Sequence, residues 1–198
     1  MGWMARSLAI GLLALATPVA AQNFSDGYSF LKAVRDRDVL KAKTLIDKPG
    51  SSIINHRDFD TGETALIIAI KRRDTPWMGF LMQSGADVNL KDRNGDTPMI
   101  LAAQGAFSEG VRVLLAGRAQ VNATNSKGET ALIKAVHAKD EDSVRMLLAA
   151  GADPDRADNL TGMSAREYAA RDVRGGPIAK MLTEAKTQKD DKKVGPSL

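Results

Sequence analysis

The chain has 198 residues, a formal net charge of +4, two histidines and no cysteine. The absence of cysteine excludes disulfides, thiolate metal sites and cysteine nucleophiles. A charge this small does not indicate nucleic-acid binding, and a hydrophobic content of 43% is ordinary for a soluble domain.

Residues 1–21 have the pattern of a secretory signal peptide. Arg6 precedes an apolar run at 8–16, and the small residues Val19 and Ala21 follow it. A basic start, a short apolar centre and small residues before the cut are typical of such a peptide. The alternative is an uncleaved membrane anchor, but a membrane span needs about 20 apolar residues. We therefore predict cleavage after Ala21, export to the periplasm or the medium, and no stable membrane insertion after cleavage.

The next stretch leads into a first helical unit. Residues 22–27 are polar, and we predict that they form a flexible lead-in. Residues 28–35 have apolar side chains at helical spacing, and Asp38 is the expected N-cap of a second helix that ends before Pro49. These two helices form a divergent first unit over residues 28–59, which we expect to cap the domain.

The chain then repeats itself at a nearly constant period. Thr64, Thr97 and Thr130 are 33 residues apart, and Ser164 follows after a further 34. A fixed period of this size is typical of a stack of small units, each of which packs on its neighbours. The internal units are expected at residues 60–92, 93–125 and 126–158, and a C-terminal cap at 159–185.

Each unit is predicted to hold two short helices. Asp74 and Asp140 are expected to cap the second helix of their units, and Ser108 is expected to do so in the middle unit. Leu114 and Leu115 are predicted to face inward there.

The end of each second helix favours a left-handed residue. Gly85 and Gly151 occupy this position in two units, whereas the third has Arg118, which would be strained there. Gly117, one place earlier, can take over the role.

Two recurring motifs carry a resemblance to a known family. Leu81–Asn89 reads Leu-Met-Gln-Ser-Gly-Ala-Asp-Val-Asn, and Gly-Glu-Thr-Ala-Leu-Ile occurs at Gly62–Ile67 and at Gly128–Ile133. This pattern resembles the ankyrin repeat over about Tyr28 to Ala185. The resemblance implies an all-α fold, an ankyrin-repeat solenoid of about five helix-turn-helix units joined by β-hairpin-like turns and preceded by the cleavable signal peptide. Residues 186–198 are charged, and we predict a disordered tail.

The residues offer no recognisable active site. His56 and His137 fall in different units, and we expect both to be solvated surface histidines. The acidic stretches around Asp92 and Asp155 do not have the ligand spacing of a calcium loop, so we interpret them as turns. We expect no enzyme activity, cofactor or metal.

The resemblance implies that a partner protein binds on the concave face, which hairpin tips and first-helix edges form. The main hypothesis is a monomeric, non-enzymatic protein-binding module in the periplasm, with a partner of unknown identity. The alternative is a secreted effector or toxin-associated protein that binds a foreign target, and an enzyme is the third hypothesis. The candidate contact residues are Asp60, Thr61, Glu63, Lys71, Arg72, Arg93, Asn94, Asp96, Gln104, Ser126, Lys127, Glu129 and His137.

Overall fold

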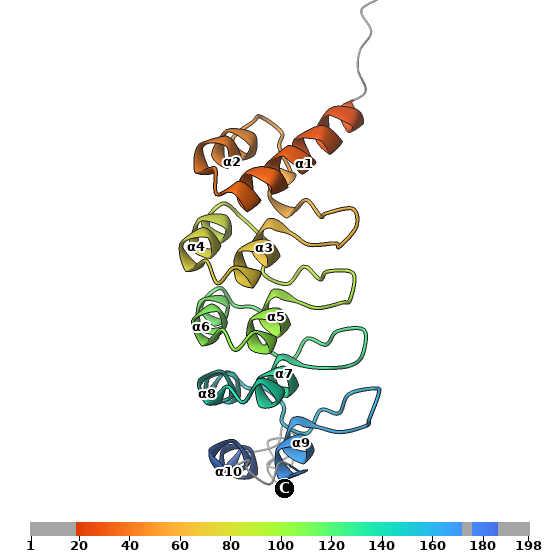
Figure 1. Ribbon diagram of the computed structural model, residues 1–198, viewed down its shortest axis with the longest axis vertical. Helices are drawn as coiled ribbons and strands as arrows, with labels where there is room; N and C mark the ends of the chain where they lie inside the picture. The colour runs from red at the N-terminus through yellow and green to blue at the C-terminus, as the bar shows by residue number, and fades with distance from the viewer. Residues whose placement is uncertain (1–18, 172–175, 186–198) are drawn as a thin grey trace, which may run out of the picture.

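The computed structural model describes residues 19–171 and 176–185 and shows helix pairs stacked along one axis (Figure 1). The inner helices are α1 (Val19–Asp36), α3 (Ala65–Lys71), α5 (Pro98–Gln104), α7 (Ala131–Ala138) and α9 (Ala165–Arg171). The outer helices are α2 (Val39–Ile46), α4 (Thr75–Gln83), α6 (Ser108–Ala116), α8 (Glu141–Ala149) and α10 (Gly176–Glu184), and the 3-10 turn η1 (Ile53–Asn55) follows α2. The loops between the units project to the side of the inner helices (Figure 1).

The loops are hairpins without extended strands. In the described ranges the only antiparallel pairs are the isolated bridges Thr124–Thr130 and Ala157–Ser164. The arrangement agrees with the predicted all-helical solenoid. No helix of the described ranges is long and apolar enough to cross a membrane.

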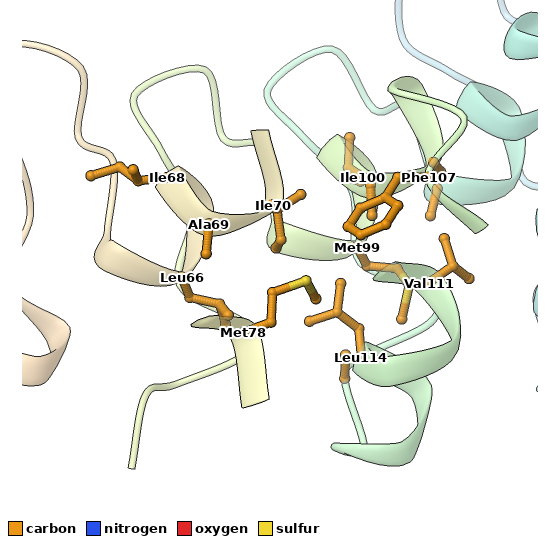
Figure 2. Packing of buried hydrophobic residues seen from close by; sticks show 14 of the residues in the cluster. Leu66, Ile68, Ala69, Ile70, Met78, Met99, Ile100, Phe107, Val111 and Leu114 are labelled. Atoms are coloured by element: carbon orange, nitrogen blue, oxygen red, sulfur yellow. The ribbon is translucent and has the colours of Figure 1, made fainter. Parts of the chain in front are cut away.

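The repeated threonines start the inner helices. The side-chain oxygens of Thr64, Thr97 and Thr130 each accept a hydrogen bond from the backbone N–H three residues later, at 3.3, 3.2 and 3.2 Å. Each cap satisfies one of the free amides at a helix start and turns the apolar residues that follow toward the neighbouring units. Side chains of α3, α4, α5 and α6 consequently form one apolar layer that runs through the stack (Figure 2).

Helix α1 begins earlier than the sequence predicts. It starts at Val19, so the helix that the sequence predicts from residue 28 also includes residues 22–27. Within this part of the helix, Asp26 pairs with Lys48 at 2.7 Å and Gly27 is buried against His56, so it contacts the rest of the first unit. Residues 1–18, which hold most of the predicted signal peptide, and the predicted tail at 186–198 lie outside the described residues.

The cap of α6 also differs from the prediction. Helix α6 begins at Ser108, and the N-cap is Phe107, which makes no capping hydrogen bond. The Phe107 ring is buried, and the Arg73 guanidinium lies 5.6 Å from its centre. Packing of an aromatic ring therefore occupies the position that Asp74 and Asp140 use for capping in the neighbouring units.

Arg118 itself adopts the left-handed conformation. Its φ angle is +59°, whereas Gly117 is an ordinary helix end with φ −77°, so Gly117 does not take over the role. The N–H groups of Arg118 and Ala119 bond to carbonyls of Leu115 and Leu114, both at 3.0 Å, and this closure requires the left-handed residue at 118. A Cβ at Gly117 would lie 2.3 Å from Cε of Met82, the flexible end of that side chain, which would have to shift.

Candidate functional site

Each hairpin is closed by one acidic or amide side chain. Asp58, Asp92, Asn125 and Asp158 occupy equivalent positions, and Oδ1 of each accepts two backbone N–H groups of its own turn. In Asp92 these bonds measure 2.8 and 3.0 Å. Side chains that satisfy local amides fix the conformation of a turn. The expectation that the acidic stretch around Asp92 forms a turn is confirmed.

Neighbouring hairpins are bonded to one another through their backbones. The amide of Arg93 donates to the carbonyl of Thr61 at 3.1 Å, that of Ser126 to Asn94 at 3.2 Å, and that of Asn159 to Lys127 at 2.8 Å. These approaches need glycine. A Cβ on Gly62, Gly95 or Gly128 would lie 2.7–2.8 Å from the amide nitrogen of the next hairpin, and all three have positive φ.

Three asparagines add a second connection between units. Oδ1 of Asn55, Asn89 and Asn122 each accepts a backbone N–H from the following unit, at 2.8 Å. Sequence reasoning missed this role, although the recurrence of asparagine at intervals of 34 and 33 residues is a signal for it. Together with the hairpin bonds, the asparagines hold adjacent units in a fixed register.

A polar network links the hairpins of Asp92 and Asn125 to α7. Nδ2 of Asn125 donates to Asp96 Oδ1 and to Glu129 Oε2, both at 2.8 Å, and Lys134 Nζ lies 2.6 Å from Glu129. Burial opposes the charge of Glu129, but the hydrogen bonds from Asn125 and Lys134 outweigh it and lower the pKa of Glu129. Asp96 is buried in this network. A partner cannot reach it, so we remove Asp96 from the candidate contact residues.

Sequence reasoning also missed Tyr168. Its ring centre lies 4.3 Å from that of His137, and its hydroxyl donates to Asp158 Oδ2 at 2.6 Å. The bond to Asp158 is the main reason why the pKa of Tyr168 is raised. The bond to Asp158 thus fixes the orientation of the Tyr168 ring beside His137. His137 is exposed, as expected, whereas His56 is half-buried.

The remaining candidate residues stay accessible. Exposed candidates on the hairpins are Asp60, Thr61, Arg93, Asn94, Ser126 and Lys127, and exposed candidates on the inner helices are Lys71, Arg72, Gln104 and His137. Glu63 and Glu129 are half-buried. Because Lys71 pairs with Glu63 at 2.5 Å and Lys134 with Glu129, the hairpins and inner helices form one surface. We call this surface, which consists of the twelve candidate residues named in this paragraph together with Lys134 and Tyr168, the inner face.

The inner face is tied to the helices beneath it. Within the described ranges, no three His, Cys, Asp or Glu side chains are grouped to hold a metal ion. Arg72 shows how strongly the surface is tied to the scaffold, since its guanidinium donates to the carbonyls of Val34 at 3.0 Å and Arg35 at 2.6 Å.

Comparison with known proteins agrees with this architecture. A family model described as ankyrin repeats (3 copies) matches residues 30–125, 74–158 and 111–193. The chain belongs to the ankyrin repeat family. No curated protein matches it. Ankyrin repeats are generally protein–protein interaction modules, and the family is typically non-catalytic.

Proposed function

We propose that this ankyrin protein is a monomeric, non-enzymatic binding protein of the periplasm that holds a protein partner on its inner face. The observation that carries the proposal is the double connection between adjacent units, through the hairpin backbones and through Asn55, Asn89 and Asn122. Side chains on such a scaffold are ordered before a partner arrives. Their ordering therefore costs little free energy on binding.

In the part of the chain that the structure describes, ion pairs between outer-helix residues lie within single helices, as in Glu109–Arg112 and Asp142–Arg145, both at a spacing of three residues. The N-cap of α4 is different, since Asp74 pairs with Arg37 of the first unit at 2.5 Å. The exposed pairs within single helices contribute little and position nothing on a neighbouring unit. The inner face is therefore the better candidate for recognition.

Export is supported by the basic and apolar pattern of residues 1–21 and by the small residues before position 22. Fractionation of cells that express the full chain tests it directly. We expect the protein in the periplasmic fraction, with Gln22 as its first residue by mass spectrometry. A full-length chain that stays in the cytoplasm would contradict export.

Partner binding is tested by affinity capture from an envelope extract with three baits. The first is the native protein, and the second carries Asn94→Ala, Gln104→Ala and Lys127→Ala, exposed changes on the inner face. The third carries Glu109→Ala, Arg112→Ala and Arg145→Ala on the outer helices. We expect a specific protein that the second bait alone loses.

Loss from the third bait instead, or absence of a specific protein from every bait, would contradict binding on the inner face in the envelope. Capture only from an extract of a foreign host would favour the secreted effector.

A further inference from the structure

Three cations on the hairpins of Asp58 and Asp92 are held in an unusual way. Arg57, Lys91 and Arg93 are exposed, and none of them forms an ion pair with a described carboxylate. Each donates to a backbone carbonyl of an adjacent hairpin. Arg57 Nη2 bonds to Lys91 O at 2.5 Å, and Lys91 Nζ bonds to Thr124 O at 2.8 Å. Arg93 Nη2 bonds to the carbonyl of Phe59.

Two of these side chains converge over one glycine. An ideal Cβ on Gly62 would lie 3.1 Å from Arg93 Cγ and 3.2 Å from Arg57 Nη2. The Arg93 guanidinium also lies 5.6 Å from the centre of the Phe59 ring, which is 74% exposed. The cations therefore border an accessible apolar side chain.

Most of the acidic side chains nearby are already in ion pairs or are buried. Asp58 pairs with Arg35 at 2.7 Å, and Glu63 pairs with Lys71 at 2.5 Å. Asp92 is buried, and its Oδ1 is bound by two amides of its own turn. Asp60 is the exposed acid that remains on the hairpin of Asp58. On these two hairpins, exposed cations therefore outnumber exposed acids by three to one.

A carbonyl acceptor positions a cation without neutralising it. A guanidinium has five N–H donors and an ammonium three, so the bonds to carbonyls leave donors free in Arg57, Lys91 and Arg93. A guanidinium fork matches a carboxylate in geometry and binds it with charge-assisted hydrogen bonds. The carbonyl tethers have already restricted these side chains, which lowers the cost of binding.

We propose that this cluster, Arg57, Lys91 and Arg93 with Phe59, binds an acidic segment of the partner protein, in which Asp or Glu residues flank an apolar residue. The inference rests on the proposed function, because Arg93 belongs to the inner face and the cluster assigns a chemical class to the partner bound there. The exposed aromatic ring of Phe59 and the carboxylate of Asp60 disfavour a uniform polyanion and favour a peptide of mixed character.

A random 12-residue peptide display library, selected on the immobilised full-length chain, tests the chemistry directly. The expected result is enrichment of Asp and Glu beside an apolar residue, relative to the unselected library. A selected peptide is then synthesised, and its Kd is measured by fluorescence polarisation. Raising the salt from about 0.1 M to about 1 M should weaken its binding, because the Debye length falls from about 10 to about 3 Å.

Two matched variants locate the site. The first carries Arg57→Gln, Lys91→Gln and Arg93→Gln. Each glutamine still supplies a side-chain N–H donor, and together the changes remove three charges. The control carries Arg112→Gln, Arg145→Gln and Lys180→Gln on the outer helices, which removes the same charge elsewhere. We expect the first variant to bind the peptide at least about tenfold more weakly and the control to bind as the native chain does. Thermal unfolding must show both variants folded; if the triple variant is not, Arg93→Gln alone replaces it.

Several outcomes would overturn the acidic-segment proposal. They are a selection without acidic enrichment or without any peptide, equal peptide binding by both variants, and tighter binding to phosphatidylglycerol vesicles or polyphosphate than to the peptide. Each of these leaves the proposed function standing, provided that partner capture still depends on Asn94, Gln104 and Lys127. If capture does not depend on those residues, the proposed function itself fails.

Discussion

Arg118 holds a left-handed backbone that glycine adopts at the same place in two other units. Its φ angle is +59°, compared with +91° for Gly85 and +84° for Gly151. A non-glycine residue in this region costs about 1–2 kcal/mol, while glycine gives up more chain entropy on folding. Arg118→Gly should therefore raise the free energy of unfolding by up to about 1 kcal/mol, measured by urea denaturation.

Gly85→Ala is the matched control for this prediction. A Cβ at Gly85 meets nothing within 4 Å, so the substitution changes only backbone preference. It should lower stability. If Arg118→Gly instead destabilised the protein, the side chain of Arg118 would have a stabilising role that outweighs its strain.

Leu114 and Leu115 separate two degrees of burial on α6. Leu114 is fully buried, whereas Leu115, also expected to face inward, is half-buried at the edge of the core. Leu114→Ala should cost about 2–5 kcal/mol of unfolding free energy, because it leaves a cavity between units. Leu115→Ala should cost clearly less in the same denaturation experiment, and an equal loss would show that Leu115 is as buried as Leu114.

Asp158 makes stability depend on acid pH. Burial alone would raise its pKa, but hydrogen bonds from Thr161, Tyr168 and Leu160 outweigh burial, and the pKa of Asp158 lies far below its usual value. A carboxyl with a lowered folded pKa stabilises the fold above its unfolded pKa, about 3.9, and this contribution is lost as the pH falls toward the folded pKa. Stability should therefore decrease below about pH 4.

Asp158→Asn should make this loss shallower in urea titrations between about pH 6 and pH 3. The pKa of Asp58 is also lowered, by hydrogen bonds from Arg35 and Thr61, so part of the slope remains. Identical slopes for the native chain and Asp158→Asn would contradict the assignment.

Helix caps distinguish α6 from α8 at the scale of the element. Asp140 caps α8, accepting from Ser143 N at 3.1 Å and from Ser143 Oγ at 2.5 Å, whereas Ser108 makes no cap on α6. Asp140→Ala should cost about 0.5–2 kcal/mol. Ser108→Ala should change stability by less than about 0.5 kcal/mol. Thermal denaturation of the two variants compares them, and equal losses would mean that Ser108 stabilises α6 in some other way.

The sequence predicts local elements better than contacts between units. The helix pairs and the caps at Asp38, Asp74 and Asp140 follow from spacing and from side chains that act within a few residues. The cap of α6, by contrast, depends on where the Phe107 ring packs. No local rule specifies such a tertiary contact.

The candidate site shows the same division. The pattern predicts which residues lie on the hairpins and inner helices, but it does not predict that Asp96 is buried and accepts a hydrogen bond from Asn125, 29 residues later. The role of Tyr168 required knowledge of its neighbours in two other segments, His137 and Asp158.

Stability across the whole molecule should vary with position in the stack. Helices α5 and α7 have neighbouring units on both sides, whereas α1 and α9 belong to the end units (Figure 1). In repeat proteins each unit is stabilised by its neighbours, so end units open more easily. Amide hydrogen exchange should be slowest in Pro98–Gln104 and Ala131–Ala138 and faster in Gly176–Glu184. Uniform protection would indicate that the stack opens only as a whole.

Asn55, Asn89 and Asn122 form the same bond across three successive junctions, to Asp87, Gln120 and Asp153. Units that are connected by the same hydrogen bond can exchange places at these junctions. A duplicated or deleted unit would meet a compatible neighbour on either side, so recombination within the gene can change the length of the array without redesign of a core. The size of the surface offered to a partner is therefore a property that evolution can adjust in steps of one repeat.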